Sequence, residues 1–175
     1  MKELKQPRHG HRQATLALIA GALCACVVGP AHAALGGEPL TAPQGATSAK
    51  AVVRAATAAS GASGATASAA SSYTVRSTSL ASGTLVNEYV SASGTVFGIA
   101  WRGPRVPDLA TLLGSYFPQY KQGLLAQRAA RGGRGQVSVE DSSLVVHSGG
   151  HMGSFAGSAY LPQFLPAGVS ASDIQ

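Results

Sequence analysis

The segment YTVRSTSLASGTLVNEYVSASGTVFGIAWR, residues 73–102, decides how this chain folds. It contains the tetrapeptide ASGT twice, at residues 81–84 and 92–95, and each copy separates two runs rich in β-branched or aromatic residues. Glycine supplies the positive φ angle that a tight hairpin turn requires. We therefore predict a three-stranded antiparallel meander, with strands at Tyr73–Leu80, Thr84–Ser91 and Thr95–Arg102.

Large side chains occupy every second position of the third predicted strand. Phe97, Ile99 and Trp101 alternate there with the smaller residues of the sequence VFGIAW. Successive side chains of a strand point to opposite faces, so the three large ones should share one buried face. Arg102 should then point outward.

A helix is predicted after the meander. Pro107 suits the first turn of a helix, and Asp108 is favourable at the positive end of the helix dipole. Apolar side chains then recur at the spacing of one helix face, at Leu109, Leu112, Leu113, Tyr116, Phe117 and Tyr120. This stripe predicts that the helix packs on the apolar face of the meander.

Pro118 lies inside this helical pattern. Because proline disfavours helical backbone at the residue before it, we expect the helix to kink or end at Phe117. A second helical segment is expected over Gln119–Ala130, with Leu124 and Leu125 facing inward.

Further strands are predicted toward the C-terminus. Gln136–Glu140 and Ser143–His147 should pair as a hairpin, the glycines of the sequence HSGG at 147–150 indicate another turn, and a last strand is expected at Phe155–Leu161. The expected fold class is therefore α+β: a small antiparallel sheet, made of the N-terminal meander and the C-terminal strands, with one kinked amphipathic helix packed on its apolar face.

An abrupt change of composition marks the expected boundary of the folded domain. Between residues 41 and 72, 26 of the 32 residues are Ala, Ser, Thr or Gly, whereas every aromatic residue lies between Tyr73 and Phe164. A stretch with so few large apolar side chains cannot offset its ordering entropy by burial. We therefore predict a disordered spacer at residues 34–72 and a folded domain at residues 73–175.

Residues 1–33 have the pattern of a secretory signal peptide. Basic residues precede an uncharged run from Ala14 to Val28, and Pro30 and the sequence AHA at 31–33 provide a cleavage site. We predict cleavage after Ala33 and export to the periplasm or beyond the cell. A permanent membrane anchor is the weaker interpretation, because the run is shorter than the roughly 20 residues that a span needs.

Both cysteines, Cys24 and Cys26, lie inside the predicted signal peptide, so the mature protein would contain no disulfide. The sequence LCAC at residues 23–26 also resembles the cleavage box of a lipoprotein. A lipid anchor at Cys26 is therefore the minor alternative to a free mature protein.

The formal net charge of +6 overstates how basic the folded part is. Four of the basic residues lie in the first dozen positions, and the remaining chain has nine Lys and Arg against six Asp and Glu. This is well short of a dedicated nucleic-acid binder. Arg128, Arg131 and Arg134 nevertheless crowd the end of the predicted helix and the Gly-rich loop after it, where they could bind an anionic envelope surface or an acidic polysaccharide.

Few residues offer catalytic or metal chemistry. His147 and His151 are four apart, but two glycines lie between them, no cysteine is available and the nearby carboxylates are only Glu140 and Asp141, so we expect neither a zinc or copper site nor a cofactor. These two histidines with Ser148 are the nominees for an enzyme, because no recognisable nucleophile motif is present.

The short motifs of the chain resemble an exported Gram-negative family catalogued as domain of unknown function 2844. They are ALGG at 34–37, LASGT at 80–84, WxGP at 101–104, PDL at 107–109, LGSYF at 113–117, HSGGHM at 147–152 and YLP at 160–162. The resemblance covers residues 34–40 and 73–175 and implies export. It implies no catalytic or binding residues.

These observations favour a non-enzymatic binding or structural module of the cell envelope. The alternatives are a hydrolase-like enzyme of unrecognised type that uses His147 and His151, or a weak metal-binding protein. The small number of titratable groups after signal cleavage argues against the enzyme.

Overall fold

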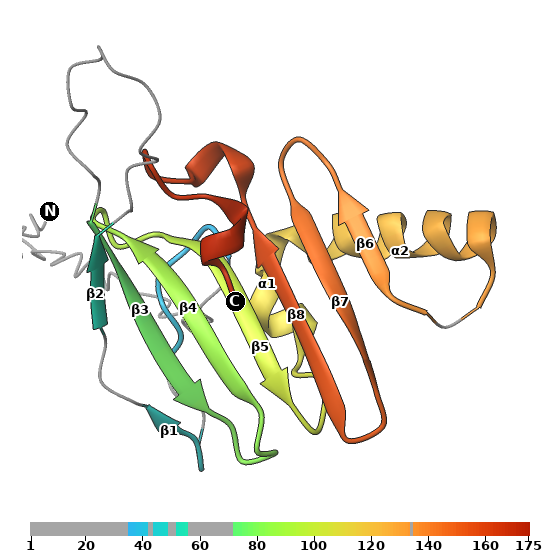
Figure 1. Cartoon of the computed structure of the whole chain (residues 1–175), viewed down its shortest axis with the longest axis horizontal. Helices are drawn as coiled ribbons and strands as arrows, with labels where there is room; N and C mark the ends of the chain where they lie inside the picture. Colours follow the sequence, from blue (N-terminus) through green and yellow to red (C-terminus); the bar gives the residue numbers. More distant parts are fainter. Residues whose placement is uncertain (1–34, 42–43, 49–51, 56–71, 134) are drawn as a thin grey trace, which may run out of the picture.

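The computed structural model describes residues 35–41, 44–48, 52–55, 72–133 and 135–175 (Figure 1). The predicted signal peptide with its two cysteines, and Arg134, lie outside these residues. The described part is an α+β domain, in which an antiparallel sheet carries helices on one face and the C-terminal segment on the other. This confirms the fold class predicted from the sequence.

Eight strands within the described ranges form one sheet, in the order β1-β3-β4-β5-β8-β7-β6, with β2 also paired to β3. Every pairing is antiparallel. The strands are β1 Thr47–Ser48, β2 Val52–Ala55, β3 Ser72–Ser79, β4 Leu85–Ser91, β5 Val96–Gly103, β6 Val137–Glu140, β7 Val145–His151 and β8 Ser154–Tyr160.

The predicted meander corresponds to β3, β4 and β5, and each strand begins and ends within one residue of its predicted bounds. Gly83 and Gly94 take the two turns with φ angles of 80° and 86°. Their N–H groups donate to the carbonyl oxygens of Leu80 and Ser91 at 2.9 Å. The repeated ASGT tetrapeptide therefore forms the same turn twice.

Phe97 does not share a face with Ile99 and Trp101, so the alternation predicted for the third strand is wrong at this residue. Ile99 and Trp101 belong to the core beneath the helices. Phe97 belongs to a second cluster on the opposite face, where its ring packs edge-on against that of Tyr73 at a centroid distance of 5.8 Å.

A β-bulge explains this reversal. Strands β4 and β5 pair regularly up to Tyr89 and Gly98, but the next pair is Val90 with Val96, which leaves Phe97 unmatched. One extra residue in a strand shifts the side chains beyond it to the other face. Phe97 therefore packs on the open face of the sheet.

The helix begins at Leu109 after Asp108, so Pro107 precedes the first turn instead of lying in it as predicted, and the helix is interrupted before Pro118. It consists of α1 Leu109–Leu113, a 3₁₀ turn at Gly114–Tyr116 and α2 Phe117–Arg131. The carboxylate of Asp108 caps the start, accepting from the N–H of Ala110 at 3.0 Å and from the hydroxyl of Thr111 at 2.7 Å. Pro118 occupies the first turn of α2, where its missing N–H needs no partner.

Leu112, Leu113 and Tyr120 are buried against the sheet, but Leu125 is 62% exposed, so its predicted inward orientation is wrong. The side of α2 that packs against the sheet contains Gly123 instead. A Cβ on Gly123 would lie 2.5 Å from Cγ1 of Val139, which shows how closely the helix approaches β6. Leu125 is two positions further along and therefore faces solvent.

The turn predicted at residues 147–150 is also wrong, because these residues lie within β7. Gly149 and Gly150 pair in the ladder with Ala156 and Phe155 of β8. A Cβ at position 150 would overlap backbone atoms of β8, so the glycine at this position allows β7 and β8 to approach closely. The turn falls at Met152 and Gly153, whose φ angle is 83°.

Part of the predicted spacer is ordered against the domain. Leu35 is 1% exposed, and its N–H donates to the carbonyl of Leu112 at 3.0 Å. Residues 44–48 and 52–55 supply β1 and β2, which pair with β3. The unpaired edge of β3 offers backbone groups to any neighbouring chain, so pairing there needs no large side chains. The disorder predicted over residues 34–72 is therefore wrong for these segments.

Each face of the sheet has its own core. The helix face buries the larger cluster, which includes Ile99, Trp101, Leu113 and Leu161. The open face buries a smaller aromatic cluster of Tyr73, Tyr89 and Phe97, closed by Ile174 of the C-terminal segment. In Figure 1 this segment crosses in front of the sheet while α1 and α2 lie behind it.

Candidate functional site

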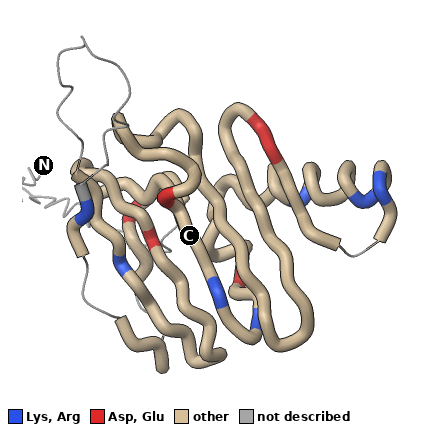
Figure 2. The backbone as a smooth tube through the Cα atoms, in the orientation of Figure 1, with Lys and Arg blue, Asp and Glu red and all other residues tan. Residues whose placement is uncertain are grey.

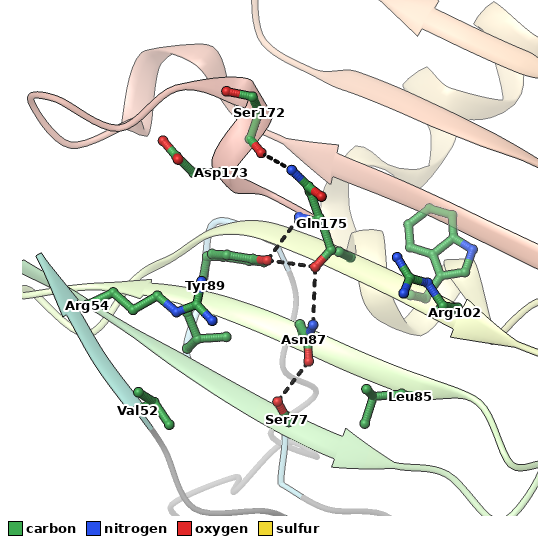
Figure 3. A pocket seen from close by; sticks show the side chains of 13 residues that line it. Val52, Arg54, Ser77, Leu85, Asn87, Tyr89, Arg102, Ser172, Asp173 and Gln175 are labelled. Carbon is green, nitrogen blue, oxygen red and sulfur yellow. Dashed lines mark hydrogen bonds between the residues drawn. The ribbon is translucent and has the colours of Figure 1, made fainter. Parts of the chain in front are cut away.

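A cleft of about 470 Å³ lies on the open face of the sheet, between β2 and the C-terminal segment (Figure 3). Its floor is formed by β3, β4 and β5. The lining side chains are mixed: two arginines, hydroxyl and amide groups, and small apolar patches. They are Val52, Arg54, Val75, Ser77, Leu85, Asn87, Tyr89, Ala100, Arg102, Ser172, Asp173 and Gln175, with Trp101 alongside.

Strand register explains why these side chains meet. Ser77 is the partner of Asn87, and Asn87 is the partner of Ala100 on the next strand. Partners on neighbouring strands point to the same face. A row of polar and small residues therefore crosses the floor of the cleft.

The hydroxyl group of Tyr89 holds the backbone of Gln175 at the centre of the cleft. It donates to the backbone oxygen of Gln175 at 2.8 Å and accepts from the N–H of the same residue at 2.9 Å. The side-chain amide of Asn87 donates to the same oxygen at 3.2 Å, and the hydroxyl of Ser77 donates to Oδ1 of Asn87 at 2.8 Å. Figure 3 shows this chain of hydrogen bonds running across the floor.

Burial raises the pKa of Tyr89 above its ordinary value of 10.0, and the hydrogen bond with Gln175 and the charge of Arg54 only partly oppose this. The phenol is therefore neutral at neutral pH. A neutral phenol can donate and accept at once, which is what its two bonds to Gln175 require.

Positive charge lies at both ends of the cleft. Arg54 on β2 and Arg102 at the end of β5 are both exposed. The carboxylate among the lining residues, Asp173, accepts from the N–H and the hydroxyl of Ser170 at 2.7 Å and 2.9 Å. The carboxylate of Asp173 therefore caps a 3₁₀ turn at Ala171–Asp173. The side chains of Arg54 and Arg102, in contrast, are exposed to solvent.

Two of the three arginines predicted to bind a ligand lie together at the far end of α2. Arg128 and Arg131 lie in its last turn and are exposed. Figure 2 shows basic residues at this end of the helix. Gly132 ends the helix, and its N–H donates to the carbonyl of Arg128 at 2.9 Å. They line a hollow between α2 and the chain leading to β6. Basic side chains here also stabilise the negative end of the helix dipole. The third, Arg134, lies outside the described residues.

The predicted metal and enzyme nominees do not come together. His147 and His151 are exposed on one face of β7, and four residues of strand separate them by about 13 Å. That is too far for two imidazoles to bind one ion. Ser148 follows His147 directly in the strand and so points to the opposite face. Within the described ranges no three His, Cys, Asp or Glu side chains are grouped as metal ligands would be.

His147 does belong to a short hydrogen-bonded chain. The hydroxyl of Ser138 lies 3.1 Å from Nδ1 of His147 and donates to Glu140 at 3.0 Å. The hydrogen bonds therefore connect the acid Glu140 to Ser138, and Ser138 to His147. In a hydrolase the histidine stands between the acid and the serine, because it must take the proton of the nucleophile. This arrangement therefore does not activate Ser138.

Sequence reasoning missed the cleft. Arg54 falls in the predicted spacer, and Tyr89 looks like any aromatic residue of a buried strand. The available signal was Asn87, a polar residue of the strand sequence LVNEYV that lies two positions from both Leu85 and Tyr89 and so on the same face as they do.

The fold and the cleft define a small α+β domain with one sheet face covered by helices and the other largely open. The chain belongs to the family described as protein of unknown function DUF2844, whose model matches residues 31–174. No curated protein and no solved structure matches the chain. Among the residues that the structure describes, no helix is long and apolar enough to cross a membrane.

Proposed function

We propose that this chain is an exported, non-catalytic module of the cell envelope that binds an anionic polymer, chiefly an acidic polysaccharide. The observation that carries this proposal is the unequal use of charge. Five of the six described carboxylates accept hydrogen bonds within the domain, the exception being the exposed Glu38, whereas arginines are exposed at two places on its surface.

The carboxylates serve turns, caps and the core. Five of them accept hydrogen bonds from backbone N–H or hydroxyl groups: Glu88, Asp108, Glu140, Asp141 and Asp173. The hydroxyl of Thr111 holds the pKa of Asp108 below its ordinary value, and the N–H of Ser143 does the same for Asp141. These negative charges are therefore partly compensated by local donors.

The arginines have a different setting. Arg54 and Arg102 lie at the ends of the cleft, and Arg128 and Arg131 lie at the end of α2, all exposed. A guanidinium group pairs with a carboxylate or phosphate through two parallel hydrogen bonds. Single exposed pairs contribute little, so binding through such residues should be multivalent and sensitive to salt.

Export rests on the predicted signal peptide at residues 1–33. N-terminal sequencing of the exported protein is expected to begin at Ala34. A lipid-modified N-terminus at Cys26 would instead make the protein a lipoprotein held at the membrane.

The proposed function is tested by retention of the mature protein on polygalacturonate coupled to beads, with neutral dextran beads as the control matrix. We expect retention at about 0.01 M salt and its loss near 0.15 M, since the Debye length falls from roughly 30 Å to 8 Å. Replacing Arg128, Arg131 and Arg134 together by Ala should remove most of the retention and leave the circular dichroism spectrum unchanged.

Two results would contradict the proposal: no retention of the parent at low salt, or equal retention of the triple variant. Binding to vesicles that contain phosphatidylglycerol is measured in parallel, to test whether the ligand is a lipid surface. Binding to vesicles but not to polygalacturonate would assign the arginines to a lipid surface instead.

A further inference from the structure

We infer that the cleft on the open face is a binding site for an acidic oligosaccharide, which lies lengthwise between Arg54 and Arg102. This inference specifies the ligand class of the proposed function. It rests on the proposed function only in assuming that the ligand is anionic. The cleft is separate from the arginines of α2, which lie beyond the opposite edge of the sheet (Figure 1).

The distance between the two arginines favours an extended ligand. Arg54 pairs with Tyr73, and Arg102 pairs with Leu85, which pairs with Ser79. Six residues along β3 correspond to about 20 Å, and the three strand spacings from β2 to β5 add about 14 Å across the sheet. One small anion cannot contact both guanidinium groups, whereas a chain with repeated acidic groups can.

The floor of the cleft favours a saccharide over a peptide. The backbone of β4 is paired on both sides, by β3 and by β5. A peptide that binds a sheet usually adds to a free edge through its backbone, and this floor has none to offer. A ligand here is contacted by side chains alone.

Those side chains suit the two kinds of surface on a sugar ring. Ser77 and Asn87 supply hydroxyl and amide groups that can exchange hydrogen bonds with ring hydroxyls. Val52 and Leu85 are 56% and 42% exposed and supply apolar contacts for the faces of the rings. The carboxylates of the sugar then pair with Arg54 and Arg102 at the two ends.

The tail of the chain fixes this arrangement. Ile174 packs against Gly98 in the aromatic cluster, where a Cβ on the glycine would lie 2.8 Å from Cδ1 of Ile174. The adjacent Gln175 is bound by Tyr89 and Asn87. One wall of the cleft is therefore anchored on its floor, so the site exists before a ligand binds and little ordering is required.

The test is isothermal titration calorimetry of the folded mature protein with hexagalacturonate at low salt. The matched ligands are neutral maltohexaose, galacturonic acid and hexaglutamate. We expect binding of hexagalacturonate and at least tenfold weaker binding of the other three. Arg54→Gln and Arg102→Gln should each weaken hexagalacturonate binding about five- to tenfold, as expected for loss of one charged hydrogen-bonding partner.

Lys121→Gln is the control, since it removes an exposed cation of α2 that lines neither the cleft nor the hollow beside Arg128 and Arg131, and it should change hexagalacturonate binding less than twofold. The inference is overturned if the hexamer does not bind, if hexaglutamate binds as well, or if the monosaccharide binds equally tightly. It is also overturned if a separate variant at the end of α2, Arg131→Gln, weakens hexagalacturonate binding and the two cleft variants do not. That last result would leave the proposed function standing, with α2 as its site.

Discussion

The indole ring of Trp101 lies directly against the α-carbon of Gly157, its partner on β8. Any Cβ at position 157 would overlap the ring at Cζ2 and would lie 2.6 Å from the carbonyl oxygen of His147. Trp101 is 2% exposed and sits in the core beneath the helices. The glycine is therefore required by the packing of the indole between β5 and β7.

Gly157→Ala is expected to destabilise the domain by about 1–3 kcal/mol, since overpacking a core forces side chains and backbone to shift. The measurement is urea unfolding followed by the fluorescence of the single tryptophan. Gly135→Ala is the matched control, because nothing lies within 4 Å of a Cβ there. It should stay within about 0.5 kcal/mol of the parent. Equal stability of the two variants would contradict the packing described.

Leu112→Ala is expected to lower the free energy of unfolding by about 2–5 kcal/mol, the usual range for truncating a buried leucine. Leu112 is 4% exposed between α1 and the sheet. Leu125→Ala makes the same chemical change on α2, where the side chain is 62% exposed, and should cost less than about 0.5 kcal/mol. Similar losses at both positions would show that the helix face has been assigned wrongly.

Local pattern was sufficient to predict the meander and the interrupted helix. The two ASGT turns set the strand lengths, because each needs a glycine with a positive φ angle at its end. The stripe from Leu109 to Tyr120 identified the buried face of the helix, since i and i+3 or i+4 neighbours meet on one side. These features depend on residues close in sequence.

The errors arise where distant segments meet. The bulge at Phe97 depends on the register with β4, and the pairing of β2 depends on a free edge at β3. The glycines of HSGG are typical of a turn, but they lie within β7, where Gly150 allows β8 to approach closely. The cleft unites Arg54, Asn87 and Gln175 from three separate parts of the chain. No local pattern in the sequence contains these relationships.

Glu88 gives the domain a pH-dependent component of stability. Its side chain is 1% exposed on the helix face, and Oε1 accepts from the N–H of Leu40 at 2.7 Å. Burial raises the pKa of this carboxyl above its ordinary value of 4.5, although the N–H of Leu40 and the charge of Arg76 on the paired strand oppose the rise. The folded state therefore holds the proton to a higher pH than the unfolded state does.

The contribution of Glu88 protonation to the free energy of unfolding is fully present below pH 4.5, and it is lost as the pH rises through the raised pKa of the folded state. Glu88→Gln stays neutral and keeps an acceptor for Leu40. We expect the stability of the parent, relative to that of Glu88→Gln, to fall as the pH rises from 4.5 through the raised pKa of the folded state. Urea unfolding across this range measures the difference. A difference that is constant with pH would show that Glu88 titrates alike in both states.

Gln127 covers the free edge of the sheet at β6. Its side-chain amide donates to the carbonyl of Gln136 at 3.0 Å and accepts from the N–H of Ser138 at 3.1 Å, so it pairs with β6 as a neighbouring strand would. Strand β6 ends the sheet order. An edge strand with unpaired backbone groups invites pairing with a second copy of the chain.

Gln127→Ala is therefore expected to cost about 1–2 kcal/mol for two lost hydrogen bonds and to increase self-association with protein concentration. Sedimentation velocity over a range of concentrations measures the association, and urea unfolding measures the stability. Gln122→Ala is the matched control, since it makes the same substitution at an exposed position of the same helix. It should sediment like the parent. If Gln127→Ala matches this control in both measurements, the amide of Gln127 does not protect the edge of β6.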